Sequence, residues 1–86
     1  MKFHITECSR AYDEINDEYS SKSFGHKEYF KDTIEDMSFG DLVINLYPDR
    51  EFEIVETNAK NCVWAFIYNK YRDICTEMKI WKFAGA

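Results

Sequence analysis

The strongest constraint on this chain is its length of 86 residues, because so short a chain can remove little surface from water. It has room for one hydrophobic core and buries only about 60–65% of the surface that its unfolded state exposes. A hydrophobic content of 45% and an aromatic content of 17% still predict a folded protein, since disordered segments are poor in such residues. We therefore expect a single domain over residues 1–86, marginally stable unless a partner or a second copy adds to it.

The negative charge is concentrated in the first half of the chain. The formal net charge is −5, and residues 1–41 hold ten acidic and five basic residues, whereas residues 42–86 hold six of each. Nucleic-acid affinity comes largely from Lys and Arg side chains that neutralise phosphates. The charge distribution therefore favours a protein partner with a basic surface over direct nucleic-acid binding.

The cysteines and the longest apolar run indicate a cytoplasmic protein. Cys8, Cys62 and Cys75 are odd in number and form no Cys-x-x-Cys motif, so we expect free thiols in a reducing compartment. The N-terminal segment lacks the apolar run of a secretory signal. Residues 62–68 form the longest apolar run, and its seven residues are far fewer than the about 20 that span a bilayer, so we expect no membrane partner.

The hydrophobic pattern predicts seven elements, of which four are strands and three are amphipathic helices. In chain order they are a strand over 2–8, a helix from the N-cap Ser9 to Tyr19, a helix over 26–37, strands over 42–47 and 51–56, a helix over 59–75 and a strand over 78–83. This is an α+β fold in the order β-α-α-β-β-α-β, with a four-stranded antiparallel sheet packed by helices. The order is compatible with a ferredoxin-like arrangement that carries an extra helix.

No residue pattern with a familiar catalytic or ligand-binding role is present. The glycines Gly25, Gly40 and Gly85 are isolated, so the chain has no Gly-rich phosphate loop. His4 and His26 have no further ligand at metal-site spacing. We therefore predict a protein without catalytic residues, cofactor or metal, and a small enzyme of unnamed reaction is only the third-ranked alternative.

An acidic face is the first feature that exceeds what folding requires. The predicted first helix carries carboxylates at i and i+4, which lie about 6 Å apart along a helix and repel one another. An ordinary solvated face explains them, and so does a negative surface that docks on a basic protein, such as a nucleic-acid-binding one. The candidate contact residues, including those of the second helix, are Asp13, Glu14, Asp17, Glu18, Asp32, Glu35 and Asp36.

Surplus aromatic residues are the second such feature. In the predicted last helix, Trp64, Tyr68 and Tyr71 form a stripe beside the apolar face that would pack on the sheet. Either the early helices cover this stripe or a partner does, and Trp and Tyr are frequent at interface hot spots. In the last strand Trp81 and Phe83 would lie on an open sheet face.

Lysines interleave these last aromatics, which gives the open sheet face two further interpretations. Lys79 and Lys82 alternate with Trp81 and Phe83 along the predicted strand. Aromatic rings with nearby lysines can stack single-stranded bases, and the same face could instead form a homodimer.

In its size, acidity, Lys-, Asn-, Ile- and Tyr-rich usage and lack of a catalytic signature, the chain resembles the small accessory proteins of tailed bacteriophages. That group includes anti-CRISPR proteins and inhibitors of host toxin or restriction systems. The resemblance is one of composition over the whole chain, and it implies stoichiometric inhibition of a host protein in the host cytoplasm. An inhibitory protein-binding module is therefore our leading hypothesis, ahead of a dimeric single-stranded RNA-binding regulator, while an antitoxin or adaptor fits nearly as well.

Overall fold

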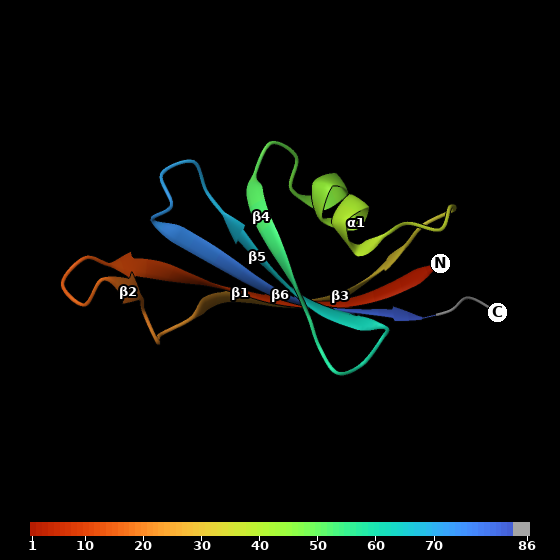
Figure 1. Ribbon diagram of the computed structural model, residues 1–86, viewed down its shortest axis with the longest axis horizontal. Coiled ribbons are helices and arrows are strands. Elements are labelled where there is room, and N and C mark those ends of the chain that lie inside the picture. Colours follow the sequence, from red (N-terminus) through yellow and green to blue (C-terminus); the bar gives the residue numbers. More distant parts are fainter. Residues whose placement is uncertain (84–86) are drawn as a thin grey trace.

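The computed structural model describes residues 1–83 and contains one strongly twisted antiparallel sheet with a short helix on one face (Figure 1). Its elements are β1 (Lys2–Asp13), β2 (Glu18–Tyr19), β3 (Phe24–Asp32), α1 (Phe39–Leu46), β4 (Glu51–Glu56), β5 (Cys62–Tyr68) and β6 (Ile74–Phe83). The strands lie in the order β2-β1-β6-β5-β4, and β3 pairs with β1 along the same edge as β2. The two longest strands, β1 and β6, therefore form the middle of the sheet.

Alternating side chains build the hydrophobic core on the face that α1 covers. Successive residues of a strand point to opposite faces, so every second residue of a strand faces the helix and contributes to the core. The strands contribute buried side chains from β1, β5 and β6, and α1 adds two more. These residues are Phe3, Ile5, Leu42, Val43, Val63, Ala65, Ile67, Met78 and Ile80. The strands predicted over 2–8 and 78–83 are thus confirmed as parts of β1 and β6.

The three predicted helices are wrong. The segment from Ser9 to Tyr19 continues β1, turns and returns as β2, residues 26–37 contain most of β3, and residues 59–75 contain β5. In β5, Val63, Ala65 and Ile67 face the core while the aromatic residues between them face outward. A segment that is apolar at every position fits both a two-striped helix and a strand, and its β-branched and aromatic residues favour the strand.

The predicted strand over 42–47 is also wrong, because this segment forms the helix α1. Ser38 caps the helix with a side-chain oxygen that accepts from the Asp41 backbone N–H at 3.1 Å. Leu42, Val43 and Leu46 then recur at helical spacing and pack on the sheet. The predicted order, the four-stranded sheet and the ferredoxin-like arrangement are therefore replaced by a larger sheet with a single helix.

A buried carboxylate fastens α1 to the sheet. Glu7 of β1 is 7% exposed and lies among core residues. Its carboxylate accepts hydrogen bonds from the hydroxyl of Tyr29 in β3 at 2.8 Å and from that of Tyr47, directly after α1, at 2.5 Å. The Lys27 ammonium lies 4.0 Å away. Burial, together with the hydrogen bond to Glu7, raises the pKa of both tyrosines well above the ordinary value.

Replacing Tyr47 by Phe should lower the free energy of unfolding by about 1.5–3 kcal/mol, the usual contribution of a hydrogen bond to a charged group. The matched control is Tyr71→Phe, because the Tyr71 side chain is 78% exposed. Urea unfolding followed by circular dichroism measures both. Equal unfolding midpoints for the two variants would contradict the proposed role of the Glu7 carboxylate.

Stability should also fall at alkaline pH. Burial and the hydrogen bond to Glu53 raise the pKa of Tyr68 to about 12, above the value of about 10 for an unfolded tyrosine. A raised folded-state pKa contributes stability that is present below pH 10 and is lost as the pH rises through the folded-state value. We expect the unfolding midpoint in urea to drop between pH 10 and 12, and to drop less steeply in the variant Tyr68→Phe. Identical slopes for variant and parent would contradict this linkage.

Candidate functional site

The sheet face opposite α1, here called the open face, carries the residues that alternate with the core. The strand register places them in rows that run across the sheet. The first row contains Phe30, His4, Trp81 and Cys62. The second row contains Glu28, Thr6, Lys79, Trp64 and Val55. The third row contains Cys8, Glu77, Phe66 and Glu53.

Large aromatic side chains gather on this face. The aromatic platform, as we name it, consists of Phe30, Trp64, Phe66, Trp81 and Phe83. Phe30 is 59% exposed, Trp64 37% and Phe83 45%, although burying such side chains is strongly favourable. The single helix of the described chain covers the other face, so the fold itself leaves these rings in contact with water.

Two cations are held against the platform. The Lys79 ammonium lies 5.4 Å from the ring centroids of both Trp64 and Trp81. The Lys2 ammonium lies 4.8 Å from the centroid of Phe30. Aromatic faces attract cations at these distances. Rings of the platform thus already lie next to two cations of the chain itself.

Two depressions lie beside the platform. The larger is a groove of about 600 Å³ that is lined by residues of β1, β3, β5 and β6, next to a register shift between Glu7 and Ser9. The smaller is a hollow of about 240 Å³, lined by Val55, Trp64, Phe66 and Glu77. Trp64 and Glu77 line both depressions, which are therefore adjacent on the open face.

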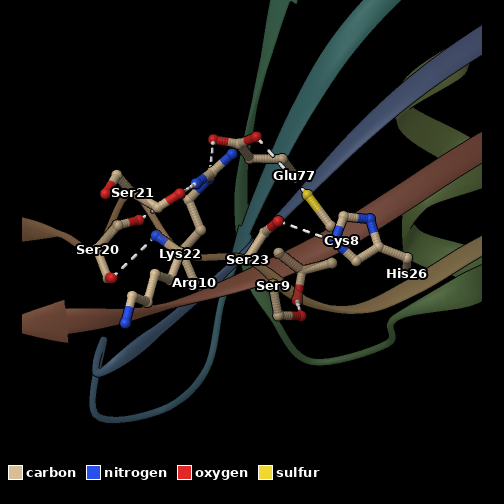
Figure 2. A network of polar contacts seen from close by, with 10 residues as sticks. Cys8, Ser9, Arg10, Ser20, Ser21, Lys22, Ser23, His26 and Glu77 are labelled. Carbon is tan, nitrogen blue, oxygen red and sulfur yellow. Dashed lines mark hydrogen bonds and ion pairs between the residues drawn. The ribbon is translucent and has the colours of Figure 1, made fainter.

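Glu77 is the charged residue at the junction of the two depressions. Figure 2 shows it between Arg10 and Cys8, with its Oε1 accepting from Arg10 Nε at 3.2 Å. Arg10 also donates to the backbone carbonyls of Ser20 and Ser21, at 3.3 and 2.6 Å. The other oxygen, Oε2, has only the weak thiol donor of Cys8, at 4.0 Å. The Oε2 atom of Glu77 can therefore accept a further hydrogen bond.

Carboxylates are in slight excess on the open face. The carboxylates are Asp32, Glu28, Glu77, Glu53 and Glu51, and the permanently charged bases are Lys2, Lys79, Arg10 and Arg72. The Arg10 guanidinium is paired with Glu77 and that of Arg72 with Glu51. This composition favours a ligand that brings positive charge.

The described residues do not assemble a recognisable reaction centre. Burial raises the pKa of the Cys75 thiol to about 11, so it remains protonated, and Cys62 is 1% exposed. Over residues 1–83 no group of three or more His, Cys, Asp or Glu side chains is placed to hold a metal ion. In the same part of the chain no helix has the length and apolarity needed to cross a membrane.

The predicted acidic helical faces are wrong, because their residues lie in turns and strands at opposite ends of the sheet. Asp13, Glu14, Asp17 and Glu18 surround the turn between β1 and β2. Asp32 pairs with Lys2 at the other end of β1, about 36 Å away for the strand rise of 3.3 Å per residue, and Glu35 and Asp36 follow it in a loop.

Several of these carboxylates have local partners. Asp13 accepts from the side chain and backbone of Asn16, which lowers its pKa, and Asp36 pairs with Lys82 at 2.9 Å. Asp17 accepts from the Tyr12 hydroxyl.

The predicted aromatic residues are only partly brought together. Trp64, Trp81 and Phe83 belong to the platform, as do Phe30 and Phe66, which the sequence analysis did not select. Tyr68 lies on the same face two residues beyond Phe66, with its hydroxyl donating to Glu53 and Arg72 4.4 Å over its ring. Tyr71 lies in the turn between β5 and β6, apart from the platform. The signal that could have located Phe66 is the recurrence of aromatic rings at every second position, at 64, 66 and 68.

Comparison with protein-family models, with curated proteins and with solved structures gives no match for this chain. Its function is therefore inferred from the geometry and chemistry of the open face.

Proposed function

We propose that this protein is a non-catalytic binding module that inhibits or regulates a partner protein by covering it with the open face. The single observation that carries the proposal is the aromatic platform, which stays partly exposed on a sheet face that no other element of residues 1–83 covers. Exposed apolar patches of this kind are typical of binding surfaces. Aromatic side chains are also the residues most enriched in the energetically dominant centres of interfaces.

Charge supports a protein partner with a basic surface. The net charge of −5 and the carboxylates of the open face would repel the phosphates of a nucleic acid. Lys82, one of the two lysines of the RNA-binding alternative, turns to the opposite face, where its ammonium donates to the Met37 carbonyl at 2.8 Å and pairs with Asp36. A second copy of the chain is also less favoured, since two open faces would bring like charges together.

The compositional resemblance to phage accessory proteins extends this proposal to a host protein as the target. Inhibitors of that group act in the host cytoplasm by occupying a functional surface. A basic, nucleic-acid-binding surface of a host defence or nucleic-acid-processing protein has the charge that the open face requires.

The test is affinity capture from the native host, followed by titration of the captured protein against variants of the platform. Trp64→Ala and Phe83→Ala should each weaken binding at least tenfold, because they remove exposed ring surface that folding does not need. Tyr71→Ala, which truncates an exposed aromatic residue outside the platform, should bind like the parent. Urea unfolding confirms that all variants remain folded.

Two outcomes would contradict the proposal. One is unchanged affinity of both platform variants for the captured protein. The other is binding of a labelled single-stranded oligonucleotide at low salt with a dissociation constant well below about 100 µM, the upper end of nonspecific affinities.

A further inference from the structure

The rings of Trp64 and Phe66 form the two walls of a slot in the platform. The residues are two positions apart in β5, so both side chains stand on the open face. Their ring planes are within 17° of parallel and their centroids are 6.5 Å apart. The hollow of about 240 Å³ lies at these rings, with Val55 on the β4 side and Glu77 on the β6 side.

The width of this slot suits one planar group. Carbon atoms in contact lie about 3.5 Å apart, so a flat group between two rings needs roughly twice that spacing. The ring centroids are 6.5 Å apart, and for rings that face one another this separation is within about half an ångström of the requirement. A small outward movement of two partly exposed side chains would admit the planar group.

The inner end of the slot offers a hydrogen-bond acceptor with negative charge. Glu77 lies opposite Phe66 in the strand register, and its Oε1 is paired with Arg10 on the side away from the slot residue Val55. Among residues 1–83 the only hydrogen-bond donor to Oε2 is the Cys8 sulfur, at 4.0 Å. Glu53, which also lies opposite Phe66, adds a second carboxylate at the rim. A group that enters the slot therefore meets two ring faces, the Lys79 ammonium beside the Trp64 ring, and a carboxylate oxygen of Glu77 that has only a weak thiol donor among the described residues.

We propose that the Trp64–Phe66 slot binds an arginine side chain of the partner protein, with its guanidinium between the rings and hydrogen-bonded to Glu77. The inference rests on the proposed function and names the chemistry by which the partner is recognised. Guanidinium is planar, stacks on aromatic faces and donates to carboxylates in a fixed fork, and it is weakly hydrated, so it leaves water readily.

Other occupants match the slot less well. A lysine ammonium is compact and strongly hydrated, so it gains the charge contact without filling the space between two planes. A nucleobase is planar, but its phosphates would approach Glu53 and Glu77. A second copy of this chain could offer Arg50 or Arg72, but Arg72 is already paired with Glu51 and stacked on Tyr68.

The experiment uses the full chain and a blocked pentapeptide with one central arginine between Gly and Ser residues, titrated while the indole N–H resonance of Trp64 is followed by NMR. The Trp64 signal is assigned from its loss in Trp64→Phe. We expect a saturable shift with a dissociation constant on the order of 1 mM. The same peptide with citrulline, which keeps the planar shape without the charge, should bind at least tenfold more weakly, and so should the lysine peptide.

Variants of the slot locate the binding. Phe66→Leu removes one ring but keeps an apolar side chain, and Glu77→Gln removes the anion, so each should weaken arginine-peptide binding at least fivefold. Glu56→Gln is the matched control, because it makes the same change in charge on an exposed residue of the helix-covered face. It should bind the peptide like the parent.

The proposed arginine site is contradicted if the Trp64 resonance does not respond to the arginine peptide, or if it responds equally to the citrulline peptide. If platform variants still lose the captured partner in that case, the proposed function stands and only the arginine site fails. Binding of an uncharged nucleoside at Trp64 more tightly than the arginine peptide would also overturn it, in favour of base stacking.

Discussion

The pairing of β1 with β6 is the interaction on which the rest of the structure depends. These strands join the two ends of the described chain, with a continuous register from Lys2 opposite Phe83 to Ala11 opposite Ile74. Phe3 and Ile5 of one strand and Met78 and Ile80 of the other fix that register, because a slip by one residue would turn the apolar residues of the slipped strand to the opposite face. The same register decides which side chains lie on the open face.

A second constraint is the lack of a second layer on that face. The helix α1 has eight residues, and together with Glu7 and its tyrosine partners it closes one side of the sheet. No other helix exists within residues 1–83 to close the opposite side. The aromatic residues of β5 and β6 therefore stay in contact with solvent although their transfer out of water is favourable. A partner protein that covers the platform would gain this free energy of burial. The small size of the fold, which leaves the rings exposed, is therefore the basis of the proposed binding activity.

The sequence predicts the parts of the fold in which hydrophobic and polar residues alternate cleanly. The first strand, the strand over Glu51–Glu56 and the last strand have that pattern, and the structure confirms them. The segment over 62–68 is apolar throughout, so period two and period 3.6 fit it equally, and only the neighbouring strands decide between them. The segment over 42–47 has the opposite ambiguity: its β-branched residues favour a strand, while the cap at Ser38 and packing on the sheet impose a helix.

The residues of the candidate site could likewise be predicted only where the secondary structure of their segment was predicted correctly. Trp81 and Phe83 could be predicted on an open sheet face because their strand is recognisable, whereas Phe66 lies in a segment that was predicted to be a helix and is a strand. The acidic residues were grouped by a helical spacing, and the sheet separates them by the length of β1. Neither Glu77 nor the slot could be predicted, since both depend on which strands are neighbours.

The central claim is that residues 62–68 form a strand whose aromatic side chains face away from the core. Proton–proton NOE spectroscopy of the uniformly labelled protein tests it directly. The account predicts cross-strand NOEs between β5 and β6, such as Trp64 with Lys79 and Ala65 with Met78, and none between the α-proton of one residue and the amide proton three residues later in 62–68. A continuous series of such i to i+3 NOEs over this segment, without the cross-strand set, would show a helix and contradict the fold and the platform together.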